Sequence, residues 1–147
     1  MNEKEDCPLC LGDGGRVVLR HPLLRIVHAN ENGFPGFYRV ISQRHVQEFT
    51  SLAEPDRVLM MAAVGLLEEL LREHLTPTKI NLASLGNVVP HLHWHVIARF
   101  AWDSHFPAPV WSPPQRPVAA PECAELTQLL PAMERDLIQR FEQGSIK

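Results

Sequence analysis

The chain has 147 residues, of which 45% are apolar and 21% are charged, and its formal net charge is −3 at pH 7. These values are typical of one globular domain, so we expect a single domain over residues 1–147. The small negative charge excludes a general attraction to nucleic acid or to an anionic membrane, and no apolar run is long enough to span a bilayer.

The first part of the chain predicts a cytoplasmic protein. The opening residues are polar and acidic, and no apolar stretch of a secretion signal follows them. The three cysteines are Cys7, Cys10 and Cys123, and an odd number without a signal peptide argues against a disulfide framework. We therefore expect reduced thiols and a cytoplasmic location.

Five segments have the composition and apolar pattern of β-strands. Turn-forming residues at positions 21–22 and 30–36 separate the first three segments. The predicted strands are Arg16–Leu19, Leu24–His28, Phe37–Ser42, Lys79–Leu85 and Leu92–Phe100.

The clearest helix is predicted from about Pro55 to His74, where leucine and alanine residues recur at three- and four-residue spacing. Ser51 and Glu54 resemble a capping box near its start. Thr76, followed by proline, is expected to end it.

A proline-rich segment and a second helix complete the chain. Residues 107–121 contain six prolines, which exclude an interior helix or a central strand. We expect an ordered loop there, followed by a C-terminal helix over about residues 122–143 that Pro131 kinks. Strands in succession with one long helix between them predict an α+β fold with a mainly antiparallel sheet of about five strands.

Residues 90–97, Pro-His-Leu-His-Trp-His-Val-Ile, carry the strongest functional signal. Successive side chains of a strand point to opposite faces, so His91, His93 and His95 share one face and the apolar residues between them face the core. Three imidazoles in a row pack poorly, which disfavours a purely structural role. The pattern permits a catalytic metal site with a further ligand, or an imidazole nucleophile beside an imidazole that stabilises phosphate oxygens.

The segment from His91 to Ile97 resembles the signature of the histidine triad (HIT) superfamily, His-φ-His-φ-His-φ-φ with φ apolar, and matches it at every position. Flanking segments resemble other parts of the family's sequences over most of the chain. They are Cys7-Pro8-Leu9-Cys10 for a zinc-binding opening, Ser42–Val46 for Pro-Lys-x-His, Asn81 for an upstream asparagine, Gly86-Asn87 for Gly-Gln, and Trp111 for a C-terminal tryptophan.

The resemblance implies a HIT-like fold and a homodimeric nucleotide phosphohydrolase or nucleotidyl transferase. Its substrate would be a nucleotide conjugate, either a dinucleoside polyphosphate or a nucleoside phosphoramidate, cleaved at the α-phosphate. The resemblance implies that His93 is the nucleophile and forms a nucleotidyl-histidine, with His95 and Asn87 assisting. The implied nucleotide-binding residues are Asn30, Asn81, Asn87 and His95.

The Cys7-x-x-Cys10 pair permits three functional interpretations and one structural alternative. A redox pair would follow a strand, and a zinc ribbon would need a second cysteine pair, so these two are disfavoured. A Cys₂His₂ structural site needs two histidines from elsewhere, and the alternative is two reduced, half-buried cysteines. The resemblance nominates His45 and His91, which would make Zn²⁺ a structural cofactor and leave the chemistry to the other two triad histidines.

Two positions depart from the family. Phe37 stands where many members have a supporting histidine, and Val88 stands where a serine or threonine lies near the leaving group. Two alternatives stay open: a zinc-stabilised nucleotide-binding module with little turnover, and a metalloenzyme with its metal at His93 and His95.

We expect the base in an apolar pocket near Leu24, Ile26 and Phe37. We expect the histidines outside these motifs at the surface, namely His21, His28, His74 and His105.

Overall fold

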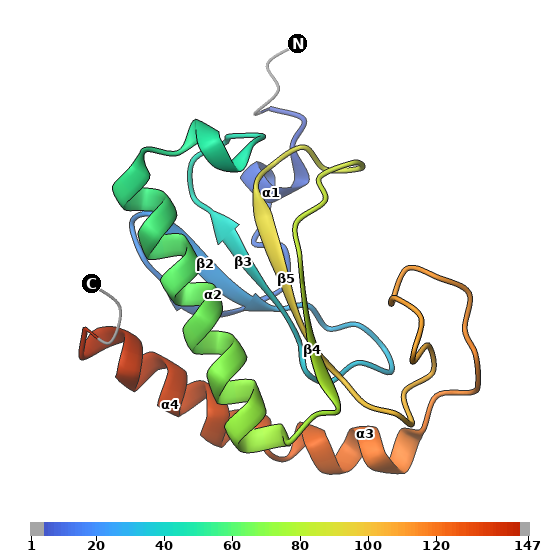
Figure 1. Cartoon of the computed structure of the whole chain (residues 1–147). Helices are drawn as coiled ribbons and strands as arrows, with labels where there is room; N and C mark the ends of the chain where they lie inside the picture. Colours follow the sequence, from blue (N-terminus) through green and yellow to red (C-terminus); the bar gives the residue numbers. More distant parts are fainter. Residues whose placement is uncertain (1–4, 145–147) are drawn as a thin grey trace.

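In the described part of the chain, five antiparallel strands form a single sheet in the order β1-β2-β3-β5-β4, so the last of these strands in sequence lies inside the sheet (Figure 1). The computed structural model describes residues 5–144. The strands are β1 (Arg16–Arg20), β2 (Leu24–His28), β3 (Phe37–Ser42), β4 (Lys79–Ala83) and β5 (His93–Arg99). The predicted α+β fold with an antiparallel sheet is confirmed.

The long helix α2 (Glu54–Leu75) packs on one face of the sheet, with helix α4 (Leu130–Glu142) beside it. The buried residues of α2 recur at three- and four-residue spacing because one stripe of the helix faces the sheet. Tyr38, Val40 and Val96 extend this core from the strands and have no exposed surface. In residues 5–144, no helix has the length and apolar character needed to cross a membrane.

The opposite face of the sheet is partly covered by the short helix α1 (Pro8–Leu11). Leu9 of α1 packs with Val27 of β2 and Ile41 of β3, and Cys7 belongs to the same buried cluster. Residues of a strand alternate between faces, so these strand residues lie between those that point into the α2 core. The N-terminal segment therefore reaches the face of the sheet that α2 leaves uncovered.

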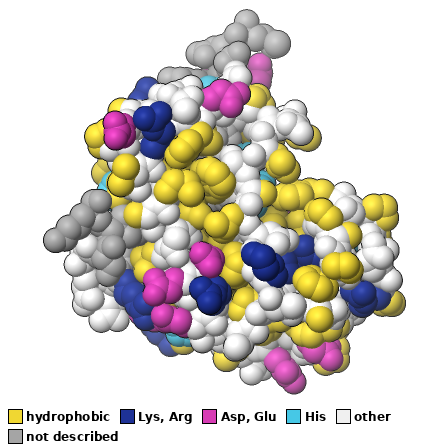
Figure 2. Space-filling model, in the orientation of Figure 1, with side chains coloured by type: hydrophobic (Ala, Val, Ile, Leu, Met, Phe, Trp, Pro, Cys, Tyr) yellow, Lys and Arg dark blue, Asp and Glu magenta, His cyan; other side chains and the backbone are white. Residues whose placement is uncertain are grey.

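Ion pairs join α4 to the end of α2. Arg140 of α4 donates to Glu73 of α2 at 2.9 Å, and Nε2 of His74 of α2 lies 3.1 Å from Oδ2 of Asp136 of α4. Figure 2 shows acidic and basic side chains gathered over these two helices. Water competes for such exposed bonds, so α4 is held mainly by its buried residues. They are Leu130, Met133 and Leu137.

The start of α2 differs from the prediction. Its N-cap is Ala53, which makes no side-chain cap bond, and Ser51 lies in a short 3₁₀ turn, η1 (Phe49–Ser51). The capping-box prediction is therefore wrong. Pro55 lies in the first turn and has no N–H to be capped, which reduces the need for a capping side chain. The helix ends as predicted, at Thr76, whose backbone is left-handed with φ 50°.

The C-terminal region forms two helices, α3 (Ala120–Thr127) and α4, rather than one kinked helix. Pro131 lies in the first turn of α4 and lacks the N–H that would bond to the end of α3, so the chain breaks before it. Residues 100–119 contain no helix or strand. This long loop connects β5 to α3.

β4 and β5 are shorter than predicted. β4 ends at Ala83 and β5 begins at His93, so residues 84–92 form a connection that leads into β5. Pro90 lies in this connection and has no N–H to donate to a ladder. His91 therefore precedes β5, while His93 and His95 lie within it.

Candidate active site and metal centre

His93 and His95 lie on the face of the sheet opposite α2. Their side chains alternate with Trp94 and Val96, which pack against or within the core under α2. Both histidines are buried, with 8% and 5% of their surface exposed. The triad face, as we call this surface, consists of Phe37, Arg39 and Ile41 of β3 and His93 and His95 of β5.

The backbone carbonyl of His91 fixes the tautomer of His93. Nδ1 of His93 lies 2.5 Å from that oxygen, so Nδ1 carries the proton and donates it. The lone pair is then on Nε2. Burial lowers the pKa of His93, so the ring is neutral at pH 7. A neutral and oriented imidazole is a competent nucleophile.

His95 is held among aromatic rings and has a buried nitrogen without a partner. Its ring meets those of Phe37, His93 and Trp111 edge-on, with centroids 5.6, 4.9 and 5.1 Å away. Burial, followed by the charges of His93 and Arg39, lowers the pKa of His95 to about 4. Within residues 5–144, no group bonds to its buried Nδ1. A bound ligand is the natural source of the missing hydrogen bond.

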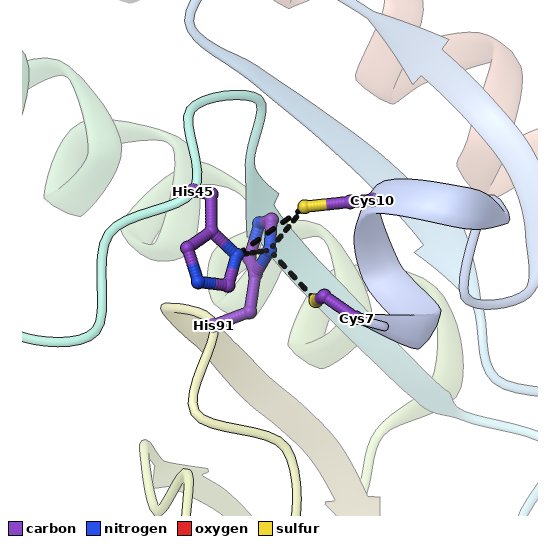
Figure 3. Close-up of side chains that lie close together, drawn as sticks. All are labelled: Cys7, Cys10, His45 and His91. Carbon is purple, nitrogen blue, oxygen red and sulfur yellow. Dashed lines mark hydrogen bonds between the residues drawn. The ribbon is translucent and has the colours of Figure 1, made fainter. Parts of the chain in front are cut away.

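Cys7, Cys10, His45 and His91 converge at the end of the sheet where β5 begins (Figure 3). The two thiols come from α1 and the residue before it, and His45 comes from the loop after β3. Nδ1 of His91 lies 3.4 Å from Sγ of Cys7, 3.5 Å from Sγ of Cys10 and 3.2 Å from Nδ1 of His45. All four ligand atoms lie within 4.8 Å of one another. The cluster could therefore hold one metal ion.

His91 has the tautomer that a metal ligand needs. Its Nε2 donates to the carbonyl oxygen of Ser42 at 2.6 Å, which leaves the lone pair on Nδ1, toward the two thiols. Burial lowers the pKa of His91 and keeps its ring neutral. Two thiolates and two neutral imidazoles balance the charge of Zn²⁺ and form its usual tetrahedral donor set. The residues present thus fit a structural zinc.

Within the described residues, the three triad histidines do not gather their nitrogens around one point. His91 faces the two cysteines, whereas Nδ1 of His93 bonds to the backbone. Within the described part of the chain, no cluster of three or more metal-ligating side chains includes His93 or His95. This geometry disfavours a catalytic metal at these two histidines.

The three asparagines predicted to bind nucleotide have other surroundings. Oδ1 of Asn81 accepts from Nη1 of Arg99 at 2.8 Å, and Oδ1 of Asn30 lies 2.9 Å from Nδ1 of His28. Asn87 is exposed in the connection before β5. Among the described residues, none of the three hydrogen-bonds to a triad histidine, so their roles stay predictions.

The expected base pocket is wrong in part. Leu24 and Ile26 are fully buried in the core under α2, on the far side of the sheet from His93. Phe37 does lie on the triad face. The surface prediction for His28 is also wrong, because its ring is 8% exposed and Nε2 lies 2.8 Å from a backbone carbonyl oxygen.

Two arginines missed by sequence reasoning connect the N-terminal segment to the sheet. Arg25 of β2 binds the turn that carries the cysteines, and Arg39 of β3 donates to the carbonyl oxygen of Gly14 at 2.9 Å. The acceptors of Arg25 are the carbonyl oxygens of Leu9, Gly12 and Asp13 and Oε1 of Gln43, at 2.6–3.1 Å. Most of these partners are backbone atoms, which residue types do not reveal. The one available signal was a charged residue at an inward strand position.

A buried ion pair anchors the other end of β5. Arg99 donates to both carboxylate oxygens of Asp103, at 2.9 and 3.1 Å, and the two side chains are 2% and 1% exposed. Arg99 also donates to the carbonyl oxygen of Ala108 at 2.8 Å. The pair thus shapes loop 100–119, from which Trp111 reaches His95. Asp103 accepts further from the backbone N–H groups of Phe100, His105 and Phe106.

The HIT domain family model matches residues 14–102 of the chain. AP-4-A phosphorylases from two strains of Mycobacterium tuberculosis are 28% identical over 107 residues, which cover 69% of this chain and 55% of each relative. The chain thus spans about half the length of the curated relatives it matches.

Similar solved structures cover most of the chain. A histidine triad protein from Bradyrhizobium japonicum is 26% identical with a TM-score of 0.66, over 84% of this chain and 93% of that one. One from Marinobacter aquaeolei VT8 is 26% identical with a TM-score of 0.67, over 85% and 92%. A zinc-bound histidine triad family protein from Mycobacterium smegmatis has the same fold, with 21% identity and a TM-score of 0.64 over 92% and 98%.

Proposed function

The chain belongs to the HIT domain family, and we propose that it is a nucleotide phosphohydrolase or nucleotidyl transferase acting at the α-phosphate of a nucleotide conjugate. The substrate class is the dinucleoside polyphosphates or the nucleoside phosphoramidates. One observation carries the proposal: Nδ1 of His93 is bonded to the His91 carbonyl, so Nε2 is an oriented, neutral nucleophile. The similarity to AP-4-A phosphorylases supports the first substrate class.

In the proposed reaction, Nε2 of His93 attacks the α-phosphorus and forms a phosphorus–nitrogen bond. The bond to the leaving group breaks, and the leaving group departs with the electron pair. The hydrogen bond from Nδ1 to the His91 carbonyl stabilises the positive charge that the ring acquires. Water or a second acceptor then displaces His93 from the nucleotidyl-histidine and restores the free ring.

We assign His95 to the oxygens of the reacting phosphate. It adjoins His93, and as a neutral ring it carries one N–H to donate. Asn87 is assigned to the same oxygens, and it must turn from its exposed position toward the triad face when nucleotide binds. Asn30 and Asn81 are assigned to the nucleotide, with Asn30 at the ribose.

We propose that Cys7, Cys10, His45 and His91 hold a structural Zn²⁺. A bound zinc would tie α1 to the start of β5 and take no part in bond breaking. His91 would serve both sites, because its Nδ1 faces the thiols while its carbonyl oxygen orients His93.

A single-turnover experiment with radiolabelled diadenosine tetraphosphate tests the enzymatic proposal. Wild-type protein should become covalently labelled, whereas His93→Ala should not, although its affinity for AMP should change by less than about tenfold. His21→Ala is the matched control, since His21 lies in the turn between β1 and β2. Near wild-type turnover by His93→Ala would show that another group is the nucleophile.

The acceptor of the second step separates a hydrolase from a phosphorylase. Product analysis with and without inorganic phosphate distinguishes them, because water releases AMP and phosphate releases ADP from an adenylylated enzyme. The curated relatives named AP-4-A phosphorylase make this comparison necessary.

The second candidate function is a nucleotide-binding module with little turnover. Phe37 is 3% exposed and packs its ring against His95, where the family resemblance leads one to expect a polar histidine. The nucleophile therefore lacks that source of support. AMP binding without any covalent intermediate would favour this candidate.

We also propose a homodimer that forms through the outer edge of β4. This strand ends the sheet and pairs with β5 on its inner side, and Leu82 is 43% exposed. A second copy would cover this edge. Light scattering should give twice the chain mass of 16.6 kDa, and Leu82→Lys should reduce the measured mass to that of a single chain. A single-chain mass for the wild type would contradict the dimer.

A further inference from the structure

Arg39 is a charged residue at the centre of the triad face that the mechanism above does not use. It pairs directly with His95 across the β3–β5 ladder, so their side chains are neighbours on one face. The Arg39 side chain is 21% exposed, which leaves it accessible from solvent. A cation at this position lies beside the proposed reaction centre and within reach of a ligand from solvent.

The guanidinium of Arg39 is held in place by its surroundings. Nη1 donates to the carbonyl oxygen of Gly14 at 2.9 Å, and Cζ lies 5.4 Å from the centroid of the Phe37 ring. That ring in turn meets His95 edge-on. A group fixed by a carbonyl and an aromatic face loses little freedom when it binds a ligand.

Arg39 keeps hydrogen-bonding capacity for a ligand. Among residues 5–144, its other polar contact is from Nη2 to Oε1 of Glu31 at 3.5 Å, which is long for an ion pair, and that carboxylate is 51% exposed. A guanidinium has more N–H donors than these two contacts use. Arg25 is the contrast on the same face, because its guanidinium is bound by four acceptors.

The charge of the triad face favours an anionic ligand. Arg39 keeps its positive charge because a guanidinium does not lose its proton in proteins, and the other residues of the triad face include no acidic side chain. The family resemblance leads one to expect polar groups near the phosphate at positions 37 and 88, but Phe37 and Val88 are both apolar. Val88 is also 92% exposed, in the connection before β5. A fixed cation in this setting attracts phosphate more strongly than the neutral groups it accompanies.

We propose that Arg39 binds phosphate oxygens of the nucleotide and supplies the charge that Phe37 and Val88 do not. This inference rests on the proposed function, since it requires a nucleotide on the triad face. Two phosphates are within its chemistry: the 5′-phosphate at the reaction centre, beside His95, and a phosphate on the ribose, beside the Asn30–Glu31 turn. Guanidinium–phosphate hydrogen bonding is the same in both cases.

Calorimetric titration of the zinc-loaded protein with adenosine, 5′-AMP and 3′-AMP tests the proposal. Arg39→Met should weaken the binding of at least one nucleotide tenfold or more and change adenosine binding less than twofold. Arg39→Lys keeps the charge and loses the planar donor pair, so it should lie between Arg39→Met and the wild type. Arg72→Met is the matched control, because Arg72 is an exposed arginine on α2 and this substitution removes the same charge.

The outcomes separate the two phosphates and the underlying function. A loss confined to 5′-AMP places Arg39 at the reacting phosphate, and a loss confined to 3′-AMP places it at the ribose; each supports phosphate binding. Equal losses for adenosine and both nucleotides, or no loss for any, overturn it.

Should Arg39→Met fail to fold by circular dichroism, Arg39→Lys decides by the same criteria. A wild type that binds no nucleotide overturns the proposed function and this inference together, whereas labelling of His93 with unchanged binding by Arg39→Met overturns the inference alone.

Discussion

The two ends of β5 are anchored by different chemistry. At the C-terminal end, Arg99 and Asp103 form a buried ion pair, and three backbone N–H groups complete the hydrogen bonds of the carboxylate. At the N-terminal end, two thiols and two imidazoles gather around Nδ1 of His91. The first arrangement is complete within the chain, whereas the second has the donor set of a metal site.

Each anchor supports a different part of the candidate active site. The ion pair shapes the loop that lays Trp111 against His95. The Cys–His cluster holds the residue whose carbonyl oxygen orients His93. Because one anchor depends on the chain alone and the other on a bound ion, they should fail under different perturbations. Loss of the Asp103 carboxylate should disrupt the first, and chelation of the metal should disrupt the second.

Breaking the ion pair should have the largest effect on stability. Asp103→Ala leaves the buried guanidinium of Arg99 without its carboxylate, so we expect unfolding to require about 3–5 kcal/mol less. Urea denaturation measures this difference. Asp136→Ala is the matched control, because Asp136 forms a more exposed pair with Arg140 at the same four-residue spacing, with side chains 28% and 33% exposed. Equal small losses for both variants would mean that burial does not strengthen the Arg99 pair.

Removing the metal should have the next largest effect. Protein purified without chelator should contain about one zinc per chain, and Cys10→Ser should lose it. If free zinc is about 100 times its Kd, this loss lowers the free energy of unfolding by roughly 3 kcal/mol. Cys123→Ser is the control, since Cys123 lies in α3, outside the cluster. Stoichiometric zinc in a Cys7→Ser, Cys10→Ser double mutant would place the metal elsewhere.

Acid should weaken the ion-pair anchor over a defined range. Burial alone would raise the pKa of Asp103, but the hydrogen bonds from Arg99 and from backbone N–H groups lower it below its ordinary value of 3.8. A carboxyl whose folded pKa is depressed stabilises the fold above its unfolded pKa and loses that contribution as the pH falls through the folded pKa. The stability gap between wild type and Asp103→Asn should thus be constant above about pH 5 and close below pH 3.8. A gap that widens in acid would contradict the assignment.

Removing the aromatic ring of Trp111, which lies in the loop shaped by the ion pair, should have the smallest effect. Trp111 is 52% exposed, so Trp111→Ala should change the free energy of unfolding by less than about 1 kcal/mol. The ring nonetheless lies against His95, and its loss should shift the imidazole resonances of that histidine in NMR spectra. Trp111→Phe keeps an aromatic ring at this position, so it should shift the His95 resonances less than Trp111→Ala does. Unchanged His95 signals in both variants would show that the contact is absent in solution.

Sequence patterns revealed the parts of this molecule that local chemistry determines. Strand alternation predicted the shared face of His93 and His95 and the burial of Val96, because that periodicity depends on backbone geometry alone. The family resemblance nominated the four side chains of the Cys–His cluster. Patterns failed where the partners are backbone carbonyls distant in sequence, as for Arg25 and Arg39. They also failed for Leu24 and Ile26, since apolarity does not tell which face of a sheet a residue occupies.

The position of β5 has a consequence for how the protein is made. Among the strands of residues 5–144, β5 is the last to leave the ribosome, yet it lies between β3 and β4 and is the one neighbour of β4. Until residue 99 has been synthesised, β3 exposes an open edge that can pair with other nascent chains. The strand that closes this edge carries His93 and His95. A truncated chain that lacks β5 should therefore be prone to aggregate, and it would lack both histidines of the proposed site.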